Sequence, residues 1–155
     1  MTVRLKGLVV AFAMAALSGC ATHAMTAGAA SADIAPMEAI QRSAAAAPQR
    51  VPGVFVMEVR GTGEDRGFAY LNSESDYRDQ RCLTIAMTPA VAEQLRHLHG
   101  GDGVSFYQGK RIRVRGEAVR TRIDFSVGGR PTGKYYYQTH VPVTDPSQIT
   151  IIGEG

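Results

Sequence analysis

The residues with the clearest capacity to bind a ligand lie between Lys110 and Lys134. This stretch contains eight lysines and arginines but only two acids, Glu117 and Asp124. Tyrosines follow at its end, so cationic groups and stacking faces occur together. That combination suits a polyanion such as a nucleic acid or a glycan. The candidate binding residues are Lys110, Arg111, Arg113, Arg115, Arg120, Arg122, Tyr135 and Tyr137.

The arginines of this stretch also have a structural interpretation. Arg111, Arg113 and Arg115 alternate with apolar residues, which is typical of the exposed face of a strand. Exposed strand arginines often pair with acids on neighbouring strands and hinder edge-to-edge pairing. A tyrosine of the segment 135–137 is also needed to fill the core. The sequence leaves both interpretations open.

Two histidines near an aspartate are the best candidate metal ligands in the sequence. His97 and His99 lie close to Asp102, but no cysteine or third histidine is near in sequence. A His-x-His pair at a helix end directs its rings apart, and zinc sites need three or four ligands. The dipole at a helix C-terminus favours exposed histidines there. We therefore predict no metal and no other cofactor.

An acidic loop contains Glu74, Asp76 and Asp79. Paired carboxylates perform acid–base chemistry or hold Ca²⁺. No nucleophile pattern and no glycine-rich phosphate loop accompanies them, since Gly61-Thr62-Gly63 is too short. Turn formation and solvation explain these acids better, so we expect a protein that is not an enzyme.

Cys20 follows Leu17-Ser18-Gly19 at the end of a short apolar run. The run covers residues 7–17, behind Arg4 and Lys6. A membrane-spanning helix needs about 20 apolar residues, so this run is too short for a permanent span. The arrangement is typical of a cleaved signal peptide over residues 1–19. The small residues before the cysteine give a peptidase access to the backbone.

The pattern at Cys20 resembles the lipobox of bacterial lipoproteins. The resemblance implies that Cys20 becomes the first residue and carries several acyl chains, which anchor a protein stably to a membrane. Ala21 stands where an aspartate would retain such a protein, which implies the outer membrane, facing the periplasm, in a Gram-negative cell. The alternative is an ordinary signal peptide, cleaved near Ala24, with a chance cysteine.

Removal of residues 1–19 changes the charge. The chain has 17 lysines and arginines and 14 acids, a net charge of +3, and loses Arg4 and Lys6 with the signal peptide. A net charge of +1 remains. Residues 20–50 are rich in alanine and have few large apolar residues, which predicts a disordered tether. Within it, residues 37–47 favour at most a transient helix. Residues 51–155 form one domain, in which Cys82 is the lone thiol and is expected to be buried.

The remaining sequence predicts a mainly β domain with one short helix. Thr88-Pro89 begins the helix, which covers residues 90–98, and Gly100-Gly101 ends it. Gly61 to Asp65 is expected to form a turn, and Gly116 a bulge or bend. The predicted strands are 54–60, 67–72, 81–87, 110–127 and 135–143, with 149–152 closing the domain. This order predicts a five-stranded Greek-key barrel of the oligonucleotide/oligosaccharide-binding (OB) type, with the helix between strands three and four.

Several segments strengthen this prediction through a family resemblance. Over residues 54–152 the chain resembles OB domains of secreted and surface-anchored bacterial proteins, some of them attached to nucleases. The matching segments are Tyr70-Leu71-Asn72, Asp76-Tyr77-Arg78, Leu83-Thr84-Ile85, residues 110–116 and residues 145–149. The hairpin of residues 121–137 is longer than in that family. The resemblance implies a non-enzymatic binding module at the cell envelope, with nucleic acid among its ligands.

An alternative function comes from a different class. The domain could serve as a structural or assembly factor that binds another envelope protein through its edge or its long hairpin. The salt dependence of binding distinguishes the two functions. Affinity for a polyanion falls steeply as the salt concentration rises, whereas affinity for a protein falls less. The oligomeric state does not follow from the sequence.

Overall fold

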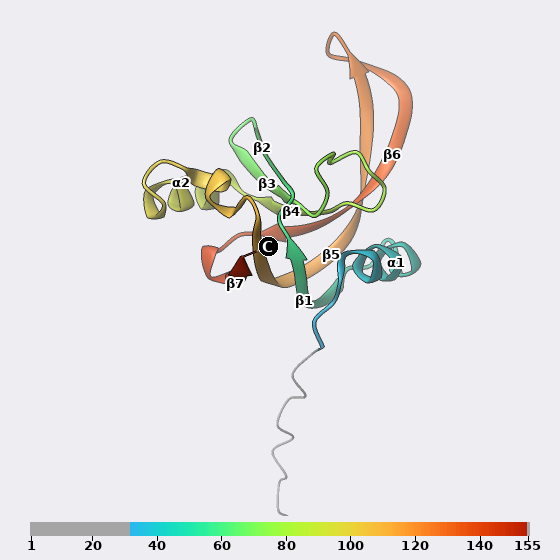
Figure 1. Cartoon of the computed structure of the whole chain (residues 1–155). Helices are drawn as coiled ribbons and strands as arrows, with labels where there is room; N and C mark the ends of the chain where they lie inside the picture. Colours follow the sequence, from blue (N-terminus) through green and yellow to red (C-terminus); the bar gives the residue numbers. More distant parts are fainter. Residues whose placement is uncertain (1–31, 155) are drawn as a thin grey trace, which may run out of the picture.

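The computed structural model describes residues 32–154, which are mainly β (Figure 1). The strands are β1 (Val51–Glu58), β2 (Gly61–Asp65), β3 (Phe68–Asn72), β4 (Leu83–Met87), β5 (Lys110–Val127), β6 (Arg130–Val143) and β7 (Ile149–Glu154). The helices are α1 (Pro36–Ala46) and α2 (Pro89–Leu98), with short 3-10 turns η1 (Gly103–Tyr107) and η2 (Pro146–Gln148). The predicted signal peptide and Cys20 lie outside the described residues.

None of the helices in residues 32–154 is both long enough and apolar enough to span a membrane.

The strands form one sheet in the order β1-β5-β6-β4-β3-β2, with β7 also paired to β5. The β4–β6 pair is parallel and the other pairs are antiparallel. The two ends of this order, β1 and β2, are consecutive in the chain and separated only by Val59 and Arg60. The Val59 N–H donates to the carbonyl of Lys110, and the Arg60 N–H donates to the carbonyl of Asn72. The chain therefore crosses from one end of the sheet to the other at this point.

The crossing confirms the predicted fold class. If β1 and β2 count as two halves of one bent first strand, the domain has a five-stranded Greek-key order with α2 between the third and fourth strands. That is the OB-like arrangement. No ladder joins β1 directly to β2, so the sheet is not a closed barrel.

Helix α2 begins and ends as predicted. The side chain of Thr88 accepts a hydrogen bond from the N–H of Val91 at 3.4 Å, and Pro89 occupies the first turn. At the other end Gly100 and Gly101 have positive φ, and the Gly101 N–H donates to the carbonyl of Arg96. These glycines satisfy the last carbonyls in a backbone conformation that other residues rarely adopt.

The prediction of a turn at Gly61 to Asp65 is wrong. This segment is strand β2 and pairs with β3 from Gly61 opposite Asn72 to Asp65 opposite Phe68. Gly61 serves close packing, because a Cβ there would lie 2.9 Å from the carbonyl oxygen of Glu74. The turn itself is shorter and lies at residues 66–67, both with positive φ.

The predicted bulge at Gly116 is also absent. The β1–β5 ladder runs without interruption from Val51 opposite Ala118 to Glu58 opposite Arg111. A Cβ on Gly116 would lie 2.8 Å from the Cγ1 of Val141, so the glycine permits two segments of the sheet to approach closely. The register of β5 shifts elsewhere, between residues 111 and 112 against β7 and between 124 and 126 against β6.

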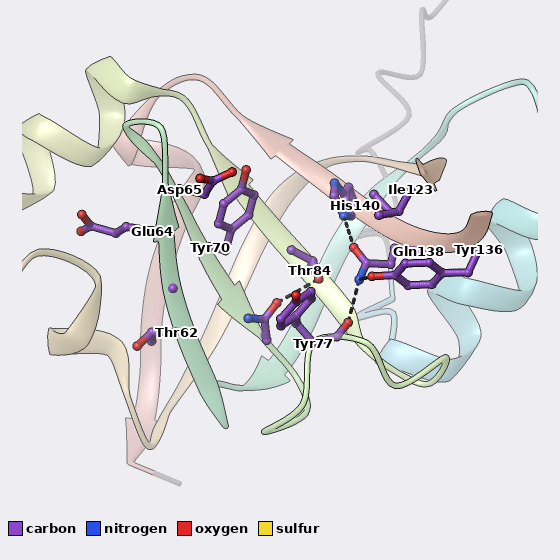
Figure 2. Close-up of a pocket in the computed structure, with 12 residues that line it drawn as sticks. Thr62, Glu64, Asp65, Tyr70, Tyr77, Thr84, Ile123, Tyr136, Gln138 and His140 are labelled. Atoms are coloured by element: carbon purple, nitrogen blue, oxygen red, sulfur yellow. Dashed lines mark hydrogen bonds between the residues drawn. The ribbon is translucent and has the colours of Figure 1, made fainter. Parts of the chain in front are cut away.

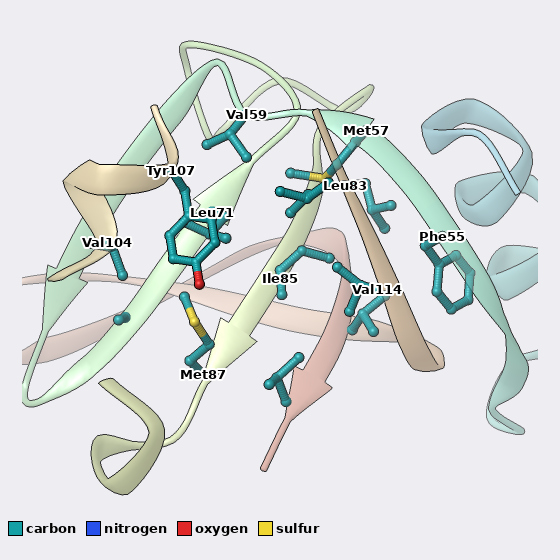
Figure 3. Close-up of a cluster of buried hydrophobic side chains, with 14 of the residues drawn as sticks. Phe55, Met57, Val59, Leu71, Leu83, Ile85, Met87, Val104, Tyr107 and Val114 are labelled. Carbon is teal, nitrogen blue, oxygen red and sulfur yellow. The ribbon is translucent and has the colours of Figure 1, made fainter. Parts of the chain in front are cut away.

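The core lies on the inner side of the curved sheet (Figure 3). Alternate residues of β5, namely Ile112, Val114 and Ala118, are fully buried, as the sequence alternation predicts. Side chains from α2 and η1 complete this core. Each large apolar side chain buried in this way contributes about 1.5–3 kcal/mol to folding.

Helix α1 and the residues before it belong to the same folded unit. The Ile34 N–H donates to the carbonyl of Val54 at 2.8 Å, and the Val56 N–H donates to the carbonyl of Ile34 at 3.0 Å. Ile34 is only 4% exposed, and Ala39 and Ser43 on the inner face of α1 are fully buried. The segment is therefore held by backbone hydrogen bonds as well as by packing.

The predicted disordered tether over residues 20–50 is wrong for residues 32–50, and the folded unit begins before the predicted boundary at residue 51. The physical reason is that α1 needs no wide apolar stripe to pack. Its small inner residues allow the helix backbone to approach the sheet closely, and Ile34 supplies the one large buried side chain. Residues 20–31 of the predicted tether lie outside the described part of the chain.

Candidate ligand-binding surfaces

The predicted basic stretch does not form one surface, because β5 presents its side chains to two sides. Arg111, Arg113 and Arg115 are exposed on the outer side of the part of β5 that pairs with β1. Arg120 and Arg122 are at even-numbered positions of β5, so they lie on the other side of the strand. Nearer the start of β5 this side holds the core residues Ile112 and Val114. The candidate residues thus separate into an outer group and a hairpin group.

Arg113 of the outer group and Lys110, at the start of β5, are held by acids. Arg113 makes a two-pronged contact with Asp33, with its Nε 3.1 Å from Oδ1 and a terminal nitrogen 2.6 Å from Oδ2. This hydrogen bonding lowers the pKa of Asp33 and raises that of Arg113. The Nζ of Lys110 lies 3.1 Å from a carboxylate oxygen of Glu154 and 4.9 Å from the ring centre of Phe106.

The remaining members of the outer group, Arg111 and Arg115, are exposed and form no ion pair with any residue of the range 32–154. They carry charge, but neither makes a cation–π contact with an aromatic ring of the described residues. This surface therefore offers cations without stacking faces.

The hairpin group forms a row of stacked cations and rings, which we call the Arg–Tyr face. The guanidinium carbon of Arg120 lies 3.8 Å from the ring centre of Tyr137, and that of Arg122 lies 4.1 Å from the ring centre of Tyr135. The two tyrosine rings meet edge to face at 5.7 Å. Four of the eight predicted binding residues are thus brought together.

The Arg–Tyr face is open to solvent because the β5–β6 hairpin extends beyond the rest of the sheet (Figure 1). Tyr135 is 50% exposed and Tyr137 is 41% exposed. Asp124 pairs with Arg122 at 2.7 Å, whereas Arg120 has no acidic partner within residues 32–154. At the base of this face, towards α1, a cavity of about 330 Å³ is lined by residues that include Ile40, Ala44 and Arg120.

A second cavity, of about 460 Å³, lies on the opposite side of the same hairpin (Figure 2). Tyr136, Gln138 and His140 of β6 reach it because they alternate with Tyr135 and Tyr137. We call it the tyrosine cavity. Its lining residues are Thr62, Gly63, Glu64, Asp65, Tyr70, Asn72, Tyr77, Thr84, Ile123, Tyr136, Gln138 and His140.

Gln138 organises one wall of the tyrosine cavity. Its Nε2 donates to the carbonyl of Tyr77 at 2.7 Å and to the hydroxyl of Tyr136 at 2.9 Å (Figure 2). The carbonyl can only accept, so the amide orientation is determined and its Oε1 faces the Nε2 of His140 at 2.8 Å. The proton of neutral His140 therefore resides on Nε2.

Burial determines the protonation states in this wall. It lowers the pKa of His140 to about 4, so the imidazole is neutral at neutral pH. Burial also raises the pKa of Tyr70, to which the charge of Asp65 adds, and the pKa of Tyr136. Tyr70 and Tyr136 consequently remain uncharged phenols at neutral pH.

Sequence reasoning did not identify the tyrosine cavity. The sequence indicates only that a tyrosine of the segment 135–137 is needed in the core, and it places Tyr70 only within a segment of family resemblance. The alternation along residues 135–140 was the available signal, because it places 136, 138 and 140 on one side together.

The acidic loop carries its own counter-ions. Asp76 contacts Arg78 at 2.9 Å and Asp79 contacts Arg81 at 2.7 Å, and each aspartate also accepts the backbone N–H of its arginine. These hydrogen bonds lower the pKa of Asp76 and lower that of Asp79 to about 2. The loop acids thus act in turn formation, and they leave no free pair of carboxylates. Cys82 at the end of this loop is buried, as predicted.

The two histidines near α2 contact different partners. The ring of His99 stacks on Phe106 with centroids 3.8 Å apart, and its Nε2 lies 3.3 Å from the hydroxyl of Tyr107. His97 lies 3.0 Å from Glu93 on the exposed side of the helix. Within residues 32–154 no three His, Cys, Asp or Glu side chains gather as a metal site would require.

Comparisons with known proteins add little. No family model matches the chain, and no curated protein matches it. Among solved structures, the chain is similar to a crystal structure assigned as an aspartyl-tRNA synthetase from Leishmania major Friedlin, with 12% sequence identity and a TM-score of 0.40. The match covers 94% of this chain and 24% of that chain. This likeness carries no argument about ligands, so the fold assignment depends on the strand order and the function on the surfaces described above.

Proposed function

We propose that the protein is a non-enzymatic binding module that a lipid on Cys20 anchors to the bacterial cell envelope, at the outer membrane facing the periplasm. We further propose that it binds an anionic polymer along the Arg–Tyr face, with single-stranded nucleic acid as the polymer that fits it best. The observation that carries this proposal is the stacking of Arg120 on Tyr137 and of Arg122 on Tyr135.

The stacked arrangement supports a nucleic acid for two physical reasons. A guanidinium held against a ring is already oriented, so less side-chain entropy is lost when it contacts a phosphate. The exposed tyrosine faces can stack with bases, each worth about 1–3 kcal/mol in single-stranded complexes. A glycan with acidic groups would use the arginines but would gain no base stacking.

The exposed outer group provides a matched control for this proposal. Arg120→Ala with Arg122→Ala removes two cations from the Arg–Tyr face, and Arg111→Ala with Arg115→Ala removes two cations from the outer side of β5. Both pairs change the net charge equally. We expect the first pair to weaken binding of fluorescent oligothymidylate by about tenfold or more, and the second pair to weaken it much less.

The measurement is fluorescence anisotropy at fixed low salt, with circular dichroism to show that both variants are folded. Equal weakening by the two pairs would mean that only net charge matters, which would contradict a defined site. Absence of binding by the unaltered protein would reject the nucleic-acid function altogether.

A second candidate is an assembly factor that binds another envelope protein through the tip of the β5–β6 hairpin. The observation that favours it is apolar exposure near the tip, where Val127 is 76% exposed and Phe125 is 46% exposed. Such an interface would respond weakly to salt. Capture of an envelope protein that Val127→Ser abolishes, with no binding of oligothymidylate, would favour this function.

A further inference from the structure

The tyrosine cavity has an electrostatic character opposite to that of the Arg–Tyr face. Its lining includes two acidic residues, Glu64 and Asp65, and none of the lining residues in the described range is a lysine or arginine. Asp65 lies on the same side of the β2–β3 ladder as Tyr70, whereas the carboxylate of Glu64 points away from the cavity (Figure 2). Its one histidine, His140, is neutral at neutral pH because burial lowers its pKa to about 4. The charged group beside the cavity is therefore the carboxylate of Asp65, which favours cations over phosphates and other anions.

The two carboxylates differ in their availability. Glu64 has an ion partner in Arg96, with 3.3 Å between Oε2 and a terminal guanidinium nitrogen, and Arg96 does not line the cavity. Asp65 forms no ion pair with any residue between 32 and 154. Asp65 also contributes to the raised pKa of Tyr70, which places its charge near that ring. A cation in the cavity would find an unpaired carboxylate close to the Tyr70 side chain (Figure 2).

Three tyrosines from separate parts of the chain supply the aromatic faces. Tyr70 comes from β3, Tyr77 from the loop before β4, and Tyr136 from β6 (Figure 2). The face of a neutral aromatic ring carries partial negative charge and attracts cations that lie within about 6 Å of its centre. The Tyr77 ring already has the guanidinium of Arg78 at 5.8 Å, outside the residues that line the cavity.

The cavity wall is arranged before any ligand enters. Gln138 joins the Tyr77 carbonyl to the Tyr136 hydroxyl, and it does so through one side-chain amide. The Asp76–Arg78 contact spans Tyr77 in the loop before β4. A preformed wall reduces the conformational entropy that the protein loses when a small ligand binds. The volume of about 460 Å³ falls within the range of small-molecule sites.

We propose that the tyrosine cavity is a binding site for a small organic cation, an alkylammonium group held between Tyr70, Tyr77 and Tyr136 and opposite the carboxylate of Asp65. The site is independent of the Arg–Tyr face, since it lies on the other side of the hairpin and selects the opposite charge. Failure of one proposal therefore leaves the other intact.

The test uses NMR chemical-shift titration of the isotope-labelled protein with three probes. Choline carries a quaternary ammonium, putrescine carries primary ammonium groups, and 3,3-dimethyl-1-butanol is a neutral molecule with the shape of choline. We expect choline or putrescine to shift the resonances of Tyr70 and Gln138, and the neutral isostere to leave them unchanged. Whichever ammonium binds identifies the class of cation.

Two variants of Tyr70 distinguish the contribution of its aromatic face to ammonium binding from the contribution of its hydroxyl. Tyr70→Leu should weaken binding of the ammonium by about fivefold, as expected from loss of one cation–π contact. Tyr70→Phe keeps the ring face and should change binding by less than about twofold. Asp65→Asn should weaken binding by several-fold, and Arg120→Ala should not affect it. Urea unfolding of each variant shows whether it remains folded.

Three outcomes would overturn the proposal. One is equal binding of choline and its neutral isostere, which would show that charge plays no part. Another is a loss of binding in Tyr70→Phe as large as that in Tyr70→Leu, which would point to hydrogen bonding with an uncharged ligand. The third is the absence of a shift with either ammonium.

Discussion

His140 is the residue whose environment affects stability most directly through pH. Its imidazole faces Gln138, with Glu64 and Asp65 elsewhere on the cavity lining, and burial lowers its pKa from 6.5 to about 4. Between these values the unfolded chain binds a proton that the folded chain does not. The free energy of unfolding is therefore expected to fall as pH decreases from 6.5 to about 4, by up to roughly 3 kcal/mol.

Urea unfolding at a series of pH values measures this dependence. His140→Gln should remove most of the slope in that window. Aspartates with lowered pKa values, such as Asp79 at about 2, lose their contribution only below their ordinary value of 3.8, so they act at lower pH. A wild-type protein whose stability does not change between pH 6.5 and 4 would contradict a buried neutral His140.

Gly116 tests close packing at the residue scale. A methyl group there would lie 2.8 Å from the Cγ1 of Val141, so Gly116→Ala is expected to lower the free energy of unfolding by about 1–3 kcal/mol. Gly63→Ala is the matched control, because nothing lies within 4 Å of a Cβ at that strand position. Thermal or urea unfolding of both variants provides the measurement. A smaller loss for Gly116→Ala than for Gly63→Ala would contradict the packing.

Residue types alone identified the arginines and tyrosines of the candidate site, but not which of them act together. The alternation around Arg111 to Arg115 predicted their exposure correctly. Continued past residue 118, the same alternation places Arg120 and Arg122 on the core side of β5. They are exposed there only because the hairpin extends beyond the core. That extension is a tertiary feature, and composition and charge do not reveal it.

At the scale of elements, helix α1 is the main departure from the sequence prediction. Its inner face buries Ala39 and Ser43, and small residues give no periodic apolar signal. Gly53 makes room for Ile34, because a Cβ there would lie 2.5 Å from the Cδ1 of Ile34. This fit between residues far apart in sequence cannot be recognised from either segment alone. The strong alternation of β5 and the Thr88-Pro89 start of α2 were predictable because they are local.

Ile34→Ala tests whether α1 and its lead-in are integral to the domain. Ile34 is 4% exposed, so the truncation is expected to lower the free energy of unfolding by about 2–5 kcal/mol. Met37→Ala is the control, since Met37 is 46% exposed and its truncation should cost much less. Equal stability of Ile34→Ala and the unaltered protein in urea would instead support the predicted tether.

At the scale of the whole molecule, we propose that location depends on a lipid on Cys20. With several acyl chains on this residue the protein should remain in the membrane fraction, whereas Cys20→Ser should leave it unlabelled and released. Metabolic labelling with a fatty acid, followed by fractionation, measures both properties. A wild-type protein without label would support the alternative of an ordinary cleaved signal peptide.

The whole molecule is also polarised in charge across one hairpin. One side presents the Arg–Tyr face, and the other encloses the acidic, aromatic tyrosine cavity. With the proposed removal of residues 1–19 the net charge would be +1, so attraction of a polyanion would have to come from this local arrangement and not from the overall charge.

The most direct test of the account is the salt dependence of oligothymidylate binding. For single strands, log K changes with log salt by about −0.7 for each phosphate that is neutralised. The account predicts that Arg120→Ala with Arg122→Ala makes this slope shallower by about 1.4, two such contacts, while Arg111→Ala with Arg115→Ala leaves it nearly unchanged. Identical slopes for all three proteins would contradict the assignment of polyanion binding to the Arg–Tyr face.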